Sequence, residues 1–177
     1  MVMSDVATAI MDAAEARMRI GGFNGFSFRD IASEVGIKSS SVHYHFPTKE
    51  NLAAAVIRRY TDEVAQLLKQ KLTTGLDPVT AWTQAFRGTL HSKERMCPCI
   101  AMGAAAQDLP AEVAAEVQRF FSMCLKEMVK AGLPRDGAAR LLATISGAML
   151  LANALDDRKA YDQATRDLIK EAELSVA

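Results

Sequence analysis

The sequence predicts an all-α fold, and three observations carry that prediction. Half of the residues are hydrophobic while only 6% are aromatic, and strong helix formers such as alanine, leucine, methionine and glutamate dominate. Apolar residues recur at helical spacing over most of the chain. No segment stands out as a strand. With 177 residues, the chain can bury a sizeable core, either as one compact body or as a small domain fused to a larger one.

The first predicted helix covers residues 4–20 and ends at a pair of glycines. A second helix begins after Ser27, whose hydroxyl can cap it, and Asp30 completes an S-x-x-D capping box three residues later. Gly36 follows at a point where a chain that leaves a helix often needs a positive φ angle. These signals predict two short helices joined by a tight turn.

The helix after this turn begins with three serines at positions 39–41 and runs to Pro47. A helix fits the major groove of B-DNA, and its N-terminal residues meet base edges and phosphates. Serine hydroxyls and free amides suit phosphate oxygens, while Tyr44 and His45 are long enough to reach bases or the flanking backbone. The residues favour a DNA-reading helix-turn-helix, with an ordinary solvated helical hairpin as the alternative.

Residues 22–52 resemble the DNA-binding region of the TetR/AcrR family of bacterial transcriptional regulators. The matching positions are Gly25, Phe26, Ser27, Arg29, Asp30, Ile31, Ala32, Gly36, Ile37, Val42, His45, Phe46, Lys49 and Leu52. One position departs from the family pattern. His43 stands where the family usually has a tyrosine that contacts phosphate, so this contact is expected to be weaker, or stronger at low pH where imidazole is charged.

The resemblance implies that the chain binds double-stranded operator DNA. Arg29 would approach the groove from the first helix of the motif, Tyr44 would face the operator, and Lys49 would hold a phosphate. The full set of expected DNA contacts is Arg29, Lys38, Ser39, Ser40, Ser41, His43, Tyr44, His45 and Lys49.

Charge gives this prediction weak support. The formal net charge is zero, and residues 1–60 carry seven lysines and arginines against six acidic residues. Specific binders need local rather than global positive charge, and a two-fold dimer doubles the contacts of each subunit. We therefore expect modest, salt-sensitive affinity.

Residues 1–50 are predicted to form a three-helix DNA-binding head, and residues 51–177 a helical body for effector binding and dimerisation. Thr48 can cap a long helix that closes near Gly75 and links the two parts. Later helix starts are expected at Asp77-Pro78, Pro98, Pro110 and Pro134, with a last helix over residues 159–173.

The helix after Pro134 carries a row of small residues, and it is apolar on more than one side, which is typical of an element packed between layers. In the resembled family the last two helices form a four-helix dimer interface. The resemblance implies a homodimer whose interface includes Ala139, Ala143, Gly147 and Leu168. The alternative is that both faces pack inside one subunit.

The predicted effector pocket is a mixture of thioethers, thiols and aromatic rings, which suits a small apolar or polarizable effector. Its expected lining residues, each of which also fits a plain core, are Trp82, Phe86, Met96, Cys97, Cys99, Met102, Phe120, Phe121 and Met149.

Cys97 and Cys99, with Cys124 elsewhere, favour a competing function class: a cytoplasmic thiol sensor of electrophiles or oxidants, or a soft-metal binding protein, with a purely structural helix-turn-helix. Two residues apart on a helix, the first two side chains point about 200° apart, so one metal ion is an awkward fit unless the segment is irregular. We expect no metal and no other cofactor.

Enzyme motifs are missing from the sequence. It contains no Walker loop, no G-x-G-x-x-G, no H-E-x-x-H and no G-x-S-x-G. The N-terminus lacks the pattern of a secretory signal, and no segment reaches about 18 uninterrupted apolar residues. We therefore expect a cytoplasmic, non-enzymatic protein without a membrane partner, most simply a repressor released from a palindromic operator by a small-molecule effector.

Overall fold

The computed structural model describes residues 5–92 and 96–176, and these residues form helices without a strand, as the sequence predicts. The α-helices are α1 (Asp5–Gly21), α2 (Phe28–Val35), α3 (Ser39–His45), α4 (Lys49–Thr73), α5 (Pro78–Ser92), α6 (Pro98–Gly103), α7 (Ala111–Lys130), α8 (Arg135–Ala154) and α9 (Lys159–Val176). Short 3-10 helices cover Gly22–Gly25 and Ala106–Asp108. Residue 4, the predicted start of the first helix, lies outside the described residues.

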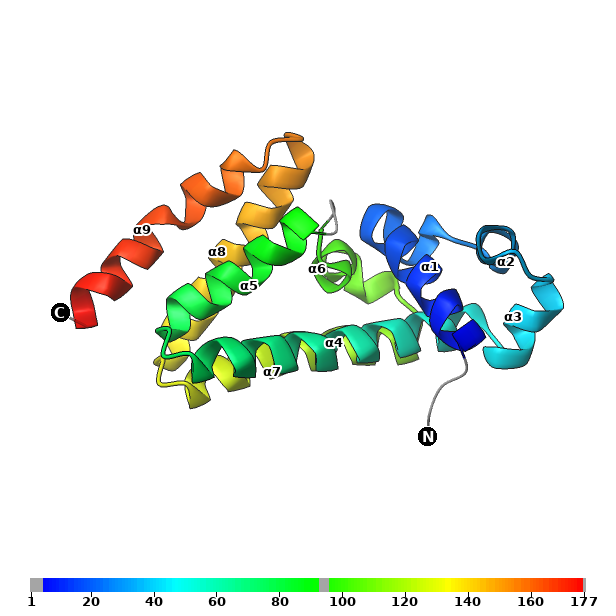
Figure 1. Ribbon diagram of the computed structural model, residues 1–177, viewed down its shortest axis with the longest axis horizontal. Coiled ribbons are helices and arrows are strands. Elements are labelled where there is room, and N and C mark those ends of the chain that lie inside the picture. The colour runs from blue at the N-terminus through cyan, green and yellow to red at the C-terminus, as the bar shows by residue number, and fades with distance from the viewer. Residues whose placement is uncertain (1–4, 93–95, 177) are drawn as a thin grey trace.

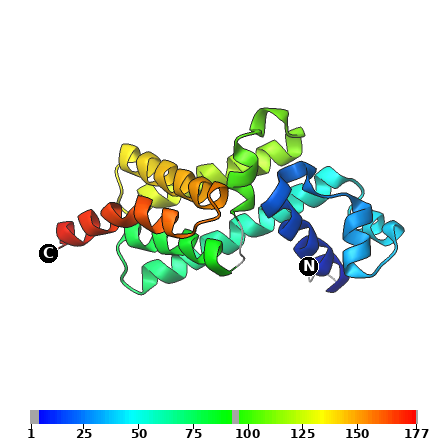
Figure 2. The same ribbon diagram turned by 90° about the horizontal axis from the view of Figure 1, so that it is seen from above.

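The molecule is elongated, with a head of α1, α2 and α3 at one end and a body of the later helices at the other (Figure 1). Helix α4 starts beside the head and then lies along α7 through the body, which both views show (Figure 2). It runs without a break through position 50, where the sequence predicts the boundary between head and body. Any rotation of α4 in the body is therefore transmitted to the head.

The head has its own apolar centre. Ile10 and Met18 from α1, Ile31 from α2, Val42 from α3 and Leu52 from α4 are each fully buried. Burying a side chain of this size contributes roughly 1.5–3 kcal/mol. One such residue from each helix therefore fixes the position of α3 against the other three.

Aromatic rings dominate the centre of the body. The ring of Phe120 on α7 lies 5.7 Å from that of Tyr60 on α4 and 6.4 Å from that of Phe86 on α5. Trp82 stacks on Phe86 at 6.2 Å, and Phe121 meets Phe120 edge-on at 5.4 Å. These spacings are those of ordinary aromatic packing. The cluster ties α4, α5 and α7 together.

Prolines and caps mark the helix starts of the body as predicted. Helix α6 begins at Pro98, α7 directly after Pro110 and α8 directly after Pro134. Asp77 caps α5, because its Oδ1 accepts a hydrogen bond from the Thr80 amide at 3.0 Å. At the start of a helix the missing amide of proline costs no hydrogen bond, so a proline there is a dependable sign of a helix start.

Helix α8 packs on α5, α7 and α9 with one apolar face. By length and composition it is also apolar enough to cross a membrane, and 39% of its most apolar stretch is buried. The sequence predicts burial on more than one side, but Ala139, Ala143 and Leu151 are exposed in the single chain. The second face of α8 is thus uncovered within this chain.

Candidate DNA-binding surface

The start of α2 is fixed by the predicted capping box. The Ser27 hydroxyl accepts from the Asp30 amide at 3.3 Å, and the Ser27 amide donates to Asp30 Oδ2 at 2.9 Å. Hydrogen bonds from the Ser27 side chain and amide lower the pKa of the Asp30 carboxyl below its ordinary value. The charged carboxylate is therefore the form that holds the helix start.

The end of α2 is fixed by Gly36. Its φ of +74° lies in the left-handed region, and the amide of Ile37 donates back to the Ala32 carbonyl at 3.0 Å. A residue with a Cβ adopts this conformation only at a cost. The turn sends the chain directly into α3.

Helix α3 is held by its two apolar residues and displays its polar ones. Val42 is fully buried and Phe46, just past the helix end, is 9% exposed. Tyr44 projects from the opposite side and is 84% exposed. The exposed or half-buried positions on this surface are Arg29, Lys38, Ser39, Ser40, Ser41, His43, Tyr44, His45 and Lys49. All nine predicted contact residues are thus at least partly accessible, and their contact with DNA stays a prediction.

The two histidines of α3 are packed differently. The ring of His43 meets the ring of Phe28 edge-on at 4.6 Å, and its Nδ1 lies 3.4 Å from the Pro47 carbonyl oxygen. His45 is half-buried and packs edge-on against Tyr44 at 5.2 Å. His43 is therefore oriented by α2 and by the loop before α4, although it stays exposed.

Lys49 has an environment that the sequence reasoning missed. Its ammonium lies 4.5 Å from the ring centre of Phe23 and 4.9 Å from that of Phe26. A cation over an aromatic face is stabilised by the ring quadrupole. The two phenylalanines before Ser27 were the signal available in the sequence. Phe23 and Phe26 thus position the ammonium of Lys49, the predicted phosphate contact, at the start of α4.

The basic residues of the first sixty positions divide into two groups. Four arginines are paired with carboxylates: Arg17 with Glu34, Arg19 with Glu15, Arg58 with Glu116, and Arg59 with Asp12 and Glu15. Arg29, Lys38 and Lys49 form no ion pair within the described part of the chain. The basic residues of this region that form no ion pair in the described part of the chain therefore all lie in the predicted contact set.

Comparisons with known proteins agree with this geometry. The sequence model for bacterial regulatory proteins of the tetR family matches residues 10–56. A TetR family transcriptional regulator of Agrobacterium tumefaciens is similar in structure over 94% of this chain and 97% of its own, with a TM-score of 0.87 and 26% identity. Over nearly its whole length, the chain is therefore similar to a TetR family regulator.

A TetR transcriptional regulator of Legionella pneumophila is also similar to this chain, with 28% identity, a TM-score of 0.84, and coverage of 97% and 98% of the two chains. The HTH-type transcriptional repressor KstR2 of Rhodococcus jostii is 30% identical over 70 residues, which are 40% of this chain. The match spans 34% of that repressor's length. It thus covers about a third of the relative.

The residues predicted to line the effector pocket lie mostly in the buried core of the body. Of the nine residues, Phe121 is half-buried and the others are buried: Trp82, Phe86, Met96, Cys97, Cys99, Met102, Phe120 and Met149. Met96 and Met102 also line a cavity of about 430 Å³ beside the glycines that end α1. A different cavity, of about 400 Å³, lies between α4 and α5 and is lined by none of the nine. Effector contact by these nine residues stays a prediction.

The three cysteines are buried free thiols. Burial raises the pKa of Cys99 and of Cys124 well above the usual range. Burial raises the pKa of Cys97 as well, but the Cys99 thiol, the Tyr60 hydroxyl and nearby amides stabilise its thiolate and lower the pKa overall. Within the described residues, no three histidines, cysteines or carboxylates are arranged to hold a metal ion.

A buried ion cluster joins the head to the body, and the sequence reasoning missed it. Arg19 donates to Glu15 Oε1 at 2.7 Å and to the Met96 carbonyl at 3.2 Å, and Arg59 on α4 donates to Glu15 Oε2 at 2.8 Å. The i, i+4 spacing of Glu15 and Arg19 was the only local signal. Their side chains are each 4% exposed. Charges this deeply buried need such partners.

Proposed function

We propose that this chain is a DNA-binding transcriptional regulator that acts as a homodimer, most simply a repressor that a small molecule releases from a palindromic operator. The observation that supports it most is the display of α3. Val42 and Phe46 hold the helix from inside, while the large Tyr44 ring stands 84% exposed on the outer side. In this position the Tyr44 side chain is free to reach a base edge or a phosphate of DNA that lies against α3.

The distribution of charge favours DNA as that partner. Within the residues that the structure describes, Arg29, Lys38 and Lys49 have no carboxylate partner, whereas the four arginines outside the motif do. A hairpin that is merely solvated gives no reason for this difference. Phosphates attract such cations, and each contact adds to the salt dependence of binding. As a regulator of this kind, the protein acts in the cytoplasm and is not an enzyme.

The uncovered face of α8 supports the homodimer. Ala139 and Ala143 are exposed and Gly147 is half-buried, so another helix can approach α8 closely at this row. Leu150, Leu151 and Leu155 add apolar surface that is 45%, 52% and 65% exposed. Leu168 on α9 is half-buried and packs against the core, so we assign it a supporting position at the edge of the interface. Two-fold symmetry would give two α3 helices for successive major grooves, about 34–36 Å apart.

Release by an effector follows if a ligand in the body changes the direction of α4. A shift in the spacing of the two heads removes one half-site, so a ligand that prefers the altered spacing lowers the affinity for DNA. The repressor named above shares similarity over only part of its length. Repression by this chain is therefore proposed here and is not carried over from that relative.

Selection of bound sequences from random duplex DNA, followed by footprinting, tests the proposal. We expect a two-fold symmetric site whose affinity falls steeply with salt. Tyr44→Ala and Lys38→Ala should each weaken binding about tenfold or more. Lys69→Ala, which removes an exposed charge from α4 outside the head, is the matched control. Failure of the folded dimer to enrich any sequence at low salt contradicts the proposal.

The competing thiol-sensor function makes a different prediction. All three cysteines are buried, so a reagent reaches them only through an opening of the body. If Cys97 and Cys99 sense electrophiles, the double replacement of both by serine abolishes the response to such compounds. Unchanged induction in the double variant would eliminate this alternative. Stoichiometric metal uptake without DNA binding would favour it instead.

A further inference from the structure

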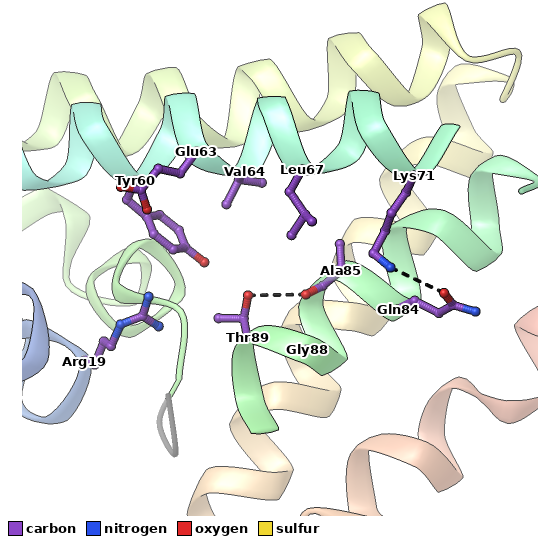
Figure 3. A pocket seen from close by; sticks show the side chains of 10 residues that line it. All are labelled: Arg19, Tyr60, Glu63, Val64, Leu67, Lys71, Gln84, Ala85, Gly88 and Thr89. Carbon is purple, nitrogen blue, oxygen red and sulfur yellow. Dashed lines mark hydrogen bonds between the residues drawn. The ribbon is translucent and has the colours of Figure 1, made fainter. Parts of the chain in front are cut away.

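The cavity of about 400 Å³ between α4 and α5 has one polar end that the head helps to build. Arg19 of α1, Tyr60 of α4 and Thr89 of α5 surround this end, and Figure 3 shows the Tyr60 hydroxyl directed from α4 toward the other two. Its volume lies within the range of small-molecule sites. A ligand at this end would touch the head helix directly.

The middle of the cavity is apolar and its far end is polar. Val64 and Leu67 of α4 face Ala85 of α5 across the middle (Figure 3). Beyond them, Lys71 Nζ lies 3.5 Å from the side-chain oxygen of Gln84. A ligand that fills this space therefore has a largely apolar body with one polar group beside Tyr60.

The Tyr60 hydroxyl is a donor without a good acceptor. Tyr60 is 3% exposed, and among the described residues its hydroxyl has no hydrogen-bond partner other than the weak interaction with the Cys97 side chain. Burial raises the pKa of Tyr60 well above its usual range, so the phenol keeps its proton. The adjacent Cys97 thiol is only a weak acceptor. A buried donor without a good acceptor destabilises the protein, and a ligand that supplies an acceptor would recover that loss.

The charges beside Tyr60 are already balanced. Arg19 stands over the Tyr60 ring with its guanidinium 5.1 Å from the ring centre, but it is paired with Glu15 through its Nε and one terminal nitrogen. Glu63 also lines the cavity. At this end a carboxylate ligand would meet these two acidic side chains without an unpaired cation, because the Lys71 ammonium lies beside Gln84 at the far end of the cavity. A neutral oxygen acceptor avoids that repulsion.

We propose that this cavity binds a small, neutral, largely apolar molecule through a carbonyl oxygen that accepts a hydrogen bond from Tyr60. Its apolar part lies between Val64, Leu67 and Ala85. Because Arg19 belongs to α1, the bound molecule contacts head and body at once. Its effect on DNA release rests on the function proposed above, whereas its binding does not.

The probe for this site is the naphthalene ketone prodan, with the same naphthalene bearing propyl in place of the propionyl group as the control ligand. Isothermal titration of wild-type protein should show one prodan per chain. Tyr60→Phe removes only the hydroxyl, and it should weaken prodan about tenfold while the propyl control binds both proteins equally. Equal effects on the two ligands, or no binding of prodan to the wild type, would overturn the proposal.

Gly88 offers a second, independent variant. It lines the cavity, and a Cβ at this position would have no neighbouring atom within 4 Å. Gly88→Leu should fill the cavity and abolish prodan binding without unfolding the helix, because leucine is the better helix former. Gly88→Ala makes the same backbone change with one methyl group and should retain binding. If Gly88→Leu still bound prodan, the binding site would not be the cavity between α4 and α5.

A charge test and a DNA test complete the design. In competition with prodan, the anion 8-anilinonaphthalene-1-sulfonate should bind with a larger dissociation constant than prodan does. Tighter binding of the anion would contradict the proposal of a neutral ligand. In the DNA assay, prodan should release wild-type protein but not Gly88→Leu. Wild-type protein that binds DNA and prodan together without release overturns the regulatory role alone. Wild-type protein that binds prodan but no DNA leaves the cavity supported and contradicts the proposed function.

Discussion

The head and the body differ in how they satisfy their polar groups. In the head, Ser27 and Asp30 satisfy each other, Thr48 accepts from the Asn51 amide, and the described buried side chains leave no polar atom without a partner. In α4, α5 and α8 of the body, buried side-chain atoms without a hydrogen bond among the described residues occur at Tyr60, Thr80, Trp82, Thr83 and Ser146. Such groups need an explanation wherever they occur. The buried polar side chains of the head are all partnered, in part by groups of the body such as Arg59 and the Met96 carbonyl, whereas the body keeps unpartnered groups that a ligand could satisfy.

Of the changes predicted here for head and body, Phe120→Ala in the body should have the largest effect on stability. Phe120 is fully buried and touches the rings of Tyr60, Phe86 and Phe121. Its loss should lower the free energy of unfolding by about 4 kcal/mol, because a large cavity remains at the junction of α4, α5 and α7. Chemical denaturation measures this change. A loss below about 1 kcal/mol would mean that the body collapses around the gap and is less rigid than the head.

Gly36→Val should be the most damaging conservative change in the head. Valine at a φ of +74° should destabilise the protein by about 2 kcal/mol and weaken DNA binding with it. Gly36→Asn is the control, since asparagine tolerates the left-handed region. Equal stability of the two variants, measured by thermal unfolding, would show that the turn relaxes.

Two buried tyrosines test whether loss of a hydroxyl without a good partner changes the stability less than loss of a hydrogen-bonded hydroxyl. The Tyr161 hydroxyl donates to the Thr83 carbonyl at 2.9 Å, so Tyr161→Phe should cost about 1 kcal/mol. The Tyr60 hydroxyl has no partner other than the weak interaction with the Cys97 side chain, so Tyr60→Phe should be neutral or slightly stabilising. Denaturation of both variants without ligand gives the answer. A larger loss of stability in Tyr60→Phe than in Tyr161→Phe would contradict this difference between the two hydroxyls.

The smallest effect concerns the capping box at acidic pH. The pKa of Asp30 is lowered by its hydrogen bonds from Ser27. A lowered pKa means that this stabilisation is present above the ordinary carboxyl pKa and is lost as pH falls through the folded-state value. Ser27→Ala should therefore flatten the acid limb of the stability curve relative to wild type. Parallel curves for the two proteins between neutral pH and pH 3 would contradict this role.

Local signals in the sequence were sufficient for the fold. The Ser27–Asp30 box, the positive φ of Gly36 and the prolines before α6, α7 and α8 each act within a few residues, so the sequence places them correctly. The burial of Val42 and the exposure of Tyr44 also follow from spacing on α3.

Contacts between distant residues were not predictable in the same way. Nothing near Lys49 in the sequence indicates that its ammonium rests on Phe23 and Phe26, because that contact needs the turn between α1 and α2. Residues expected to line a pocket, such as Trp82 and Phe120, are buried in the core, and their contact with an effector stays a prediction. A residue type alone does not distinguish a cavity wall from a packed interior, because both are apolar.

The bond from Arg19 to the Met96 carbonyl also limits how this protein can be recombined. A chimera that joined residues 1–50 to the body of a relative would keep Glu15 and Arg19 but lose the carbonyl just before α6 and the partner Arg59 on α4. Head exchange in this protein therefore requires that the acceptor body bring an equivalent carbonyl and arginine. The transplantable unit extends beyond the helix-turn-helix to the parts of α4 and α6 that meet α1.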